Sequence, residues 1–593
     1  MADGSLAGHS IHEVKDLSLP QQLYLYERTR RFKERKRINS SSERGVDTEY
    51  GSQEAPPLCE VTDGDVEERV DNPDSTVYLI FMEGSTRTRE SLRNAAVYHG
   101  VKVNEFQAES SSFKKNETIT DTMKMLSVYS TQRSVFVIRS ALEGVCSWLR
   151  TAMSAHARRM GVPTPSFVNA GDGLFTHPIG EFVDILSLLE HNQWDRSAVH
   201  LALVGDLAHG RTAHSKVQGL QIFKKVRVDL VAPEIFGYPV EYRDRMRANG
   251  FEVREFASVE EYLENASNVA DVWYFYKPQF SKCGDLTTLR LNELRAQVSF
   301  REEWVHQLPE GVRFFQTLPR DKEYPIIPLT LDSRAINGWD TVAANAYFLD
   351  VVLLSMLFGK IGRNLAPPAD EAGFNSVQES PPKLAFSSEL PSFMKEVTLV
   401  EDAHHRDLER ARAGGPVPIK DGCVLDHLGL GPTSSKCWEA LRKVRTILGW
   451  SKQVGSEGVY TSKGNPGFYK GILTLPGFDY KRLRVEEMKM MASVAPGCTF
   501  NCVKESKVVR KYRLEVPERI YNLPNISCKN ALCVSNPENR QREIVAYLER
   551  VPYYVSSVLP NCTESKYLYV CKWCRWPHVY ENIWDDLRRQ AVA

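Results

Sequence analysis

The chain has no excess of charge of either sign. Among its 593 residues, 75 Lys and Arg balance 75 Asp and Glu. A general nucleic-acid binder usually carries a basic excess, so we expect no nucleic-acid partner. Long apolar runs are also lacking. The most apolar stretch, Ala343 to Phe358, is interrupted by Asn345 and Asp350 and is shorter than the roughly 18 apolar residues of a membrane-spanning helix, which favours a buried helix and no membrane partner.

An apolar core of signal-peptide length is missing from the first residues, MADGSLAGHSIHEVKD. We therefore expect a cytoplasmic protein in a reducing compartment, where disulfides rarely persist. The twelve cysteines are then expected to be thiols or metal ligands. The length exceeds what one hydrophobic core organises and predicts two to four domains. A hydrophobic fraction of 42% and a charged fraction of 25% are ordinary for globular proteins.

Short apolar runs rich in β-branched and aromatic residues recur through the first 360 residues and predict buried strands. These runs are Thr76–Met82, Ser134–Ile138, His200–Val204, Val226–Val231, Val272–Phe275 and Val312–Phe315. Helical patterns separate them, among them Arg89–His99 and Ile119–Tyr129. Alternation of strands and helices predicts parallel sheets covered by helices.

The composition changes after Gly362. Residues 363–415 are rich in Pro, Ser, Glu and Ala, which predicts a long linker with a short helix near His404–Arg412. Ordered structure is expected to resume at Ile419, and Thr433 to Trp450 has the pattern of an amphipathic helix. A cysteine-rich module closes the chain.

The segment Phe81 to Arg89 has the pattern of a phosphate-binding site. A strand runs into Ser85-Thr86-Arg87-Thr88, which opens a helix. Unpaired N–H groups at a helix start favour an anion, and hydroxyls with an arginine add bonds that suit a phosphate. The alternative is an ordinary helix cap with solvated arginines.

Three further polar segments accompany it. Ser111 to Thr118 is a loop with two lysines before a helix, and Val204 to Thr212 is a buried strand ending in a turn that presents Arg211. Asn169 to Pro178 contains a Gly-Asp-Gly loop followed by His177 at a helix start. Ligands of parallel sheets bind beyond the carboxyl ends of the strands, where such segments lie.

Together these segments resemble one family. Ser-Thr-Arg-Thr-Arg, Lys-Asn-Glu-Thr, Asn-Ala-Gly-Asp-Gly with His-Pro, and Gly-Asp-Leu with Gly-Arg-Thr look like aspartate carbamoyltransferase, over roughly His9 to Gly362. Ornithine carbamoyltransferases share the first motif. The Gly-Asp-Leu segment favours aspartate, and the His-Cys-Leu-Pro of the ornithine branch is replaced here by Gln316-Thr317-Leu318-Pro319.

The resemblance implies that carbamoyl phosphate and L-aspartate give N-carbamoyl-L-aspartate and phosphate, for pyrimidine biosynthesis, in a trimer or larger homo-oligomer without a catalytic cofactor. It implies these carbamoyl-phosphate-binding residues: Ser85, Thr86, Arg87, Thr88, Ser111, Lys115, Arg139 and His177. Ser111 and Lys115 would come from a neighbouring subunit. The residues implied to be catalytic are Arg87, Thr88, Lys115, Arg139 and His177. The residues implied to bind aspartate are Arg211, Thr212, Lys277, Gln279 and Leu318, and Glu83 matches a residue that bridges the two domains.

Three substrate contacts depart from the family. Gly180 stands where the family has a glutamine, and Lys277 replaces an arginine that grips the aspartate side chain. Lysine keeps the charge but loses the planar two-pronged geometry. Gln316-Thr317 replaces His-Pro. We expect weaker use of aspartate with an intact phosphate site. Two alternatives stay open: a catalytically impaired relative that binds carbamoyl phosphate or nucleotide as a regulator or scaffold, and a carbamoyltransferase for another amine.

Near the C-terminus, four cysteines form two close pairs, Cys528 with Cys533 and Cys571 with Cys574. A strand-forming stretch at residues 543–559 separates the pairs. This spacing suits a tetrahedral zinc site with four thiolates, which leaves no open position for catalysis and is therefore structural. The alternative is an accidental cluster of buried thiols.

The preceding region resembles the regulatory chain of the bacterial enzyme, a nucleotide-binding domain followed by a four-cysteine zinc domain. The motifs are Asp426-His427, Leu475-Pro476-Gly477, Ala495 to Asn501, and Lys507 to Lys511. The resemblance implies an ATP or CTP effector held by Asp426, Lys481, Asn501 and Lys511, although a second expected lysine is Val485 here. The alternative is a small α+β domain with solvated lysines.

The implied fold class is α/β, with two doubly wound parallel-sheet domains in the catalytic part, an α+β nucleotide-binding domain and a small β-rich zinc domain. The expected boundaries are 1–185 for carbamoyl phosphate, 186–335 for aspartate, 336–362 for a helix returning to the first domain, 363–415 for the linker, 416–513 for the regulatory domain and 514–593 for the zinc domain.

Overall fold

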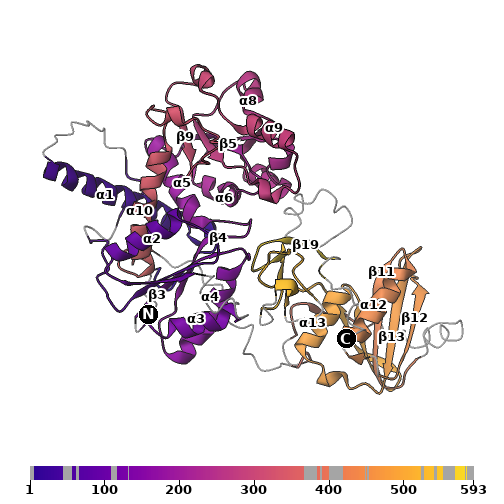
Figure 1. The fold of residues 1–593 in the computed structure, drawn as a ribbon. Helices are drawn as coiled ribbons and strands as arrows, with labels where there is room; N and C mark the ends of the chain where they lie inside the picture. Colours follow the sequence, from indigo (N-terminus) through magenta and orange to yellow (C-terminus); the bar gives the residue numbers. More distant parts are fainter. Residues whose placement is uncertain are drawn as a thin grey trace. The chain divides into compact units, whose positions relative to one another are not determined.

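The computed structural model describes residues 6–44, 56–61, 66–107, 117–130, 132–365, 384–386, 390–399, 418–447, 449–450, 453–521, 526–539, 544–551, 568–580 and 583. The chain divides into two compact units, the first mainly Met1–Asn375 and the second mainly the remainder of the chain. Figure 1 traces both along the sequence. The helix expected near His404–Arg412 lies outside the described residues.

The first unit begins with a four-stranded parallel sheet of order β2-β1-β3-β4. Its strands are β1 (Thr76–Phe81), β2 (Lys102–Gln107), β3 (Ser134–Ser140) and β4 (Ser166–Asp172). Its helices are α1 (Leu19–Arg44), α2 (Arg87–Tyr98), α3 (Ile119–Ser127), α4 (Val145–Met160) and α5 (Pro178–His191). Every residue of β1 is buried, as its run of β-branched and aromatic side chains predicts.

A second parallel sheet of the same unit has the order β7-β6-β5-β8-β9. Its strands are β5 (Val199–Gly205), β6 (Val226–Val231), β7 (Glu252–Phe256), β8 (Val272–Tyr276) and β9 (Arg313–Gln316). Its helices are α6 (Arg211–Gly219), α7 (Val240–Ala248), α8 (Val259–Asn265) and α9 (Thr288–Val298). Leu201 and Leu203 of β5 belong to one core, and Ala202 and Val204 to another, so both faces of this sheet are covered.

Helix α10 (Trp339–Leu357) returns from the second sheet and packs against α1, α2 and α5. Among the described helices it alone is long and apolar enough to cross a membrane, and 67% of that apolar window is buried inside the fold. Asn345 and Asp350, which interrupt the apolar run, are themselves buried. These facts agree with the buried helix that the sequence predicts.

The second unit contains a six-stranded sheet of order β10-β15-β14-β11-β13-β12, in which every pairing is antiparallel. Its strands are β10 (Met394–Glu396), β11 (Gly422–Gly431), β12 (Ser456–Thr461), β13 (Tyr469–Pro476), β14 (Thr499–Lys504) and β15 (Lys507–Leu514). Leu425, Phe500 and Tyr512 pack in one core with side chains of α12 (Ser434–Ile447) and α13 (Val485–Val494). A smaller antiparallel sheet contains β16 (Arg519–Tyr521), β17 (Tyr547–Val551), β18 (Leu568–Cys571) and β19 (Pro577–Val579).

Two features differ from the sequence analysis. Part of the expected linker 363–415 is structured, because β10 pairs with β15 and buries Phe393 and Met394 in the core of the second unit. Strands β2, β4 and β7 were not predicted. In β7 the reason is physical: the strand lies at a sheet edge, its sequence is charged, and none of its residues is fully buried.

Candidate active site

Both parallel sheets place their ligand-facing loops where the strand order reverses. In the first sheet this point lies between β1 and β3, and in the second between β5 and β8. Arg139 lies at the end of β3, and the segments after the other three strands carry Glu83 to Arg87, Arg211 and Lys277. Adjacent strands whose connections run in opposite directions leave a crevice at their carboxyl ends, which is the usual ligand site of such sheets.

The expected phosphate site is the turn from β1 into α2. The helix begins at Arg87, and the side chain of the N-cap residue Thr86 makes no capping hydrogen bond. Thr86 therefore does not cap the first N–H groups of α2 with its side chain. N–H groups at such a helix start can donate hydrogen bonds to an anion. The Arg87 guanidinium donates from Nη1 to the backbone carbonyl of Leu318, which brings the last expected substrate loop to the phosphate turn.

His177 is held as a neutral imidazole. It is the N-cap of α5, and its Nδ1 accepts a hydrogen bond from the Gly180 N–H at 3.3 Å, so the ring proton resides on Nε2. Nε2 lies 3.4 Å from Oγ1 of Thr88. Burial, and then the charges of Arg139, Arg211 and Arg87, lower the pKa of His177 well below its ordinary value. At neutral pH the ring is a hydrogen-bond donor, not a cation.

The cleft holds more positive than negative charge. The Arg211 Nη2 lies 2.9 Å from Oε2 of Glu83, and Nε of Arg139 lies 3.8 Å from the same oxygen. This carboxylate joins the first sheet to α6. Burial and the charges of Arg211 and Arg87 lower the pKa of Arg139 to about 10, so it remains charged at neutral pH. Within the described residues, Nε of Arg139 and Nη1 of Arg211 are buried without a hydrogen-bond acceptor, which favours binding of an anion.

Gly171 leaves room for the two arginines. Its φ of +111° is strained for other residues, and a Cβ there would lie 2.9 Å from Nη1 of Arg211 and 3.2 Å from Nη1 of Arg139. The neighbouring carbonyl of Ala170 accepts a hydrogen bond from Nη1 of Arg139 at 3.1 Å. The Asn-Ala-Gly-Asp-Gly motif therefore shapes the cleft with its backbone.

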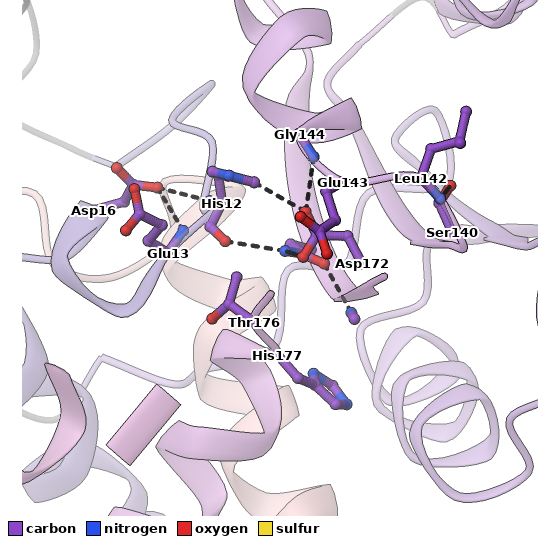
Figure 2. Close-up of polar contacts among 12 residues, drawn as sticks. His12, Glu13, Asp16, Ser140, Leu142, Glu143, Gly144, Asp172, Thr176 and His177 are labelled. Atoms are coloured by element: carbon purple, nitrogen blue, oxygen red, sulfur yellow. Dashed lines mark hydrogen bonds and ion pairs between the residues drawn. The ribbon is translucent and has the colours of Figure 1, made fainter. Parts of the chain in front are cut away.

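A buried polar network supports this loop from behind, as Figure 2 shows. Asp172 accepts hydrogen bonds from the Gly144 N–H and from Nδ2 of Asn169, both at 2.9 Å. His12 of the N-terminal segment lies with Nδ1 3.8 Å from Asp172 and stacks on Phe175. Burial raises the pKa of Asp172. The sequence analysis did not single out His12, because nothing in its local pattern shows that its segment pairs with β4.

Two of the residues expected to bind aspartate, Lys277 and Gln279, contact other groups of the protein. Nζ of Lys277 pairs with Asp321 at 2.9 Å and, mainly by this hydrogen bond, lowers the pKa of that carboxyl group. Gln279 donates from its backbone N–H to Asp206 and from Nε2 to the carbonyl of His209. Lys277 is therefore neutralised locally, and Gln279 fixes the loop after β5.

Lys282 is a cation that the sequence analysis missed. Burial and then the charge of Arg211 lower its pKa, while Glu83 and Asp206 act in the opposite direction. Its side chain is exposed, and these influences place it within electrostatic range of Arg211, Glu83 and Asp206. The sequence signal that points to Lys282 is its place in the loop after β8, at the end of the short helix Phe280–Lys282.

Gly180 stands in a tight space. A Cβ there would lie 3.1 Å from Cγ2 of Thr212 and 3.2 Å from Cδ2 of His177. The glutamine that the family carries at this position therefore does not fit without movement of its neighbours. Ser111 and Lys115, expected from a neighbouring subunit, lie outside the described residues.

The four cysteines converge as their spacing predicts. The sulfur atoms of Cys528, Cys533, Cys571 and Cys574 lie within 4.8 Å of one another, and all four residues are buried. Nε2 of His578 lies 3.3 Å from the Cys528 sulfur, where a ring N–H stabilises a thiolate. This donor set suits one structural metal ion.

The expected effector residues are partly brought together. Asp426 pairs in register with Thr499, and Asn501 with Lys511, so these side chains share the sheet face opposite the core residues Leu425, Phe500 and Tyr512. The Asp426 carboxylate pairs with Lys470 at 2.8 Å, a contact that sequence reasoning missed. Lys481 is exposed in the turn Tyr480–Arg482, and among described residues its side chain makes no ion pair with Asp426.

Comparisons with known proteins agree with this geometry. Residues 9–190 match the family of aspartate/ornithine carbamoyltransferase, carbamoyl-P binding domain, and residues 417–515 match the aspartate carbamoyltransferase regulatory chain, allosteric domain. The fold and the arginine-rich cleft thus define a carbamoyltransferase with a regulatory region.

Full-length relatives carry the identification further. The chain is 37% identical to Protein PyrBI of Treponema denticola, over 98% of this chain and 99% of the relative, and 38% identical to Protein PyrBI of Thermotoga maritima over the same shares. The chain belongs to the family of fused aspartate carbamoyltransferases, with catalytic and regulatory parts in one polypeptide. The predicted transfer of a carbamoyl group to aspartate, in pyrimidine biosynthesis, is confirmed.

A solved structure also matches the catalytic part. The aspartate transcarbamoylase of Trypanosoma cruzi in complex with N-(phosphonacetyl)-L-aspartic acid is 22% identical, with a TM-score of 0.46, over 60% of this chain and 97% of that chain.

We predict that Gly171→Ala lowers kcat/KM for aspartate by about tenfold or more, because the added methyl displaces Arg211 and Arg139 by a fraction of an ångström. Gly161→Ala is the matched control. Gly161 also has a positive φ, +67°, but a Cβ there meets nothing within 4 Å. Steady-state kinetics with thermal melting separates the two. Equal kcat/KM in both variants would contradict the role assigned to Gly171.

Proposed function

We propose that Ser85, Thr86, Arg87 and Thr88 hold the phosphate of carbamoyl phosphate, and that Arg139 and His177 surround the carbamoyl oxygen. The surplus of guanidinium charge over the single Glu83 carboxylate is the observation that supports this assignment. The attack of the aspartate amino group builds negative charge on the carbonyl oxygen and on the leaving phosphate. Fixed donors stabilise such charge because they need no reorganisation when it appears.

Each group has a role that its chemistry allows. A neutral His177 donates its Nε2 proton in a hydrogen bond to the carbamoyl oxygen, and Arg87 offsets the charge on the leaving phosphate. Arg211 and Thr212 bind aspartate at the start of α6, with Gln279 and the Leu318 carbonyl shaping the adjacent loops. Lys282 supplies cationic charge on the side of the cleft where Lys277 is neutralised by Asp321.

The same proposal covers the subunit assembly, the domain boundaries and the effector. Ser111 and Lys115 complete the site of a neighbouring subunit in a catalytic trimer or larger assembly. The domain boundaries given above divide the chain into carbamoyl-phosphate, aspartate, regulatory and zinc domains. ATP or CTP is the effector of the sheet face opposite α12 and α13, where Asp426, Asn501 and Lys511 lie together with Lys470.

Arg87→Ala tests the catalytic assignment. We expect kcat to fall about 100- to 1,000-fold, the usual loss when one donor to transition-state charge is removed. Arg93→Ala is the control, because Arg93 lies on the same helix, is half exposed and pairs with Glu105. Ureido product is measured with aspartate, ornithine and other amines. Comparable activity of the two variants would refute the phosphate site.

We expect the purified protein to hold one zinc ion per chain, bound by Cys528, Cys533, Cys571 and Cys574. Replacing Cys571 with Ala should release the ion and unfold the module around it, because metal binding and folding are coupled. Cys437→Ala, which alters a buried thiol of α12, should keep the ion. Metal analysis decides: full zinc content in Cys571→Ala, or a different metal in the unaltered protein, counts against the assignment.

For the effector, calorimetry with the full chain should detect ATP or CTP, and Lys511→Ala together with Lys470→Ala should weaken binding about tenfold or more, since each lysine offers a charge-assisted bond. Lys436→Ala, an exposed change on α12, should leave binding unchanged. Absence of heat at millimolar nucleotide would remove the effector proposal and leave only the family relationship of this region.

A further inference from the structure

A cluster of ionisable groups outside the cleft is buried where helices α5 and α6 meet. Nζ of Lys216 lies 2.5 Å from Oε2 of Glu181 and 2.7 Å from Oδ2 of Asp184, and the side chains of all three are at most 2% exposed. The Tyr274 hydroxyl donates to Oδ1 of Asp184 at 2.8 Å. Nζ of Lys216 also lies 4.9 Å from the centroid of the Tyr274 ring. We name this group the buried triad: Lys216, Glu181 and Asp184.

The triad lies one helical turn behind the substrate-facing residues. Glu181 is four residues after His177, the N-cap of α5, and Lys216 is four residues after Thr212 in the first turn of α6. Residues four apart lie on the same side of a helix, so an ion pair between Glu181 and Lys216 fixes the two helix starts against each other. The close approach is built in at Gly219, where a Cβ would lie 2.0 Å from Oε1 of Glu181.

Such a cluster is an unusual choice for packing alone. Removing three charged groups from water is costly, and apolar residues of similar volume often stabilise a fold equally well. An ion pair with defined hydrogen bonds is directional. The short distances from Nζ to the two carboxylates therefore fix one register of α6 along α5. Apolar contacts between the same helices would permit small sliding displacements.

We propose that the buried triad is a positioning element that sets the distance between His177 and the aspartate-binding residues Arg211 and Thr212. It acts through the two helices and does not touch substrate. The proposal rests on the site assignments made above. It predicts that damage to the triad appears mainly as a higher aspartate KM and a lower kcat, while the phosphate turn at α2 is unaffected.

The charge state of the triad makes the proposal testable through the pH dependence of the aspartate KM. Burial and the neighbouring Asp184 raise the pKa of Glu181 to about 8, although Lys216 acts against them. The carboxylates raise the pKa of Lys216 above its ordinary value in spite of burial. The triad is therefore neutral at pH 7, with Glu181 protonated, and gains a second carboxylate charge as the pH rises through about 8.

The other titratable groups facing Glu181 and Asp184 are tyrosines from α1, β8 and the segment before α7. They are Tyr26, Tyr238, Tyr274 and Tyr276, and burial raises the pKa of each. These hydroxyls stay neutral in the range where Glu181 titrates. Repulsion between Glu181 and Asp184 is then expected to loosen α5 against α6 at alkaline pH.

The first experiment compares the unaltered enzyme with Glu181→Gln, which keeps the neutral form at every pH. Between about pH 7 and about pH 9.5 we expect the aspartate KM of the unaltered enzyme to rise about threefold or more relative to that of Glu181→Gln. Titration of the substrate amine affects both enzymes equally and cancels in this ratio. A ratio that does not change with pH would overturn the proposal.

The second experiment uses Lys216→Met, with Lys33→Met as control. Lys33 is also a buried lysine, but it lies on α1 and pairs with Glu190 near the other end of α5. Lys216→Met should raise the aspartate KM about tenfold, the size expected for a small misplacement of a binding group, and leave the dissociation constant of inorganic phosphate within about twofold. Lys33→Met should lower only the melting temperature.

The experiments distinguish failure of the triad proposal from failure of the site assignments. Equal changes of KM in Lys216→Met and Lys33→Met would mean that the triad only stabilises the fold, and the proposal would fail. If Lys216→Met does not fold, the pH ratio of Glu181→Gln decides alone. If Arg87→Ala retains full activity, the site assignments are wrong, whatever the triad variants show.

Discussion

The carboxylate of Glu83 stands between Arg211 and Arg139, and the catalytic cleft depends on this uneven balance of charge. One carboxylate cannot neutralise two guanidinium groups with Arg87 nearby, and among the described residues Nε of Arg139 and Nη1 of Arg211 are buried donors without acceptors. Burial, and then the charges of Arg139, Arg211 and Arg87, lower the pKa of His177 and keep its ring a neutral hydrogen-bond donor. The geometry follows from two parallel sheets whose switch points face one cleft.

The departures from the family have a physical explanation in the neighbouring side chains. The ammonium of Lys277 is neutralised by Asp321, Lys282 lies within electrostatic range of charged cleft residues, and Gly180 fits a space already narrowed by Thr212. A glutamine at position 180 would require Thr212 and His177 to move by a few tenths of an ångström.

The regulatory part gathers its polar residues on one face of a sheet, not at the ends of parallel strands. Its antiparallel sheet is covered on one face by α12 and α13, which leaves the other face to polar side chains from adjacent strands. Alternation along a strand then places Asp426, Asn501 and Lys511 together without any special loop. Segment 390–399, which by composition looks like a linker, contributes the edge strand β10 through Phe393 and Met394.

The sequence by itself determined the strands whose side chains are all buried, such as β1 and β8, because a fully buried strand is rich in apolar, β-branched and aromatic residues. It also predicted that the four cysteines converge, which the structure confirms, and that a helix opens within Ser85 to Thr88, where α2 begins at Arg87. Only the tertiary structure decided the pairing of Lys277 with Asp321, the position of His12 against Asp172 and the buried triad of Lys216, Glu181 and Asp184. Each of these joins residues distant along the chain or on separate helices, and local pattern carries no information about which charges the fold brings into contact.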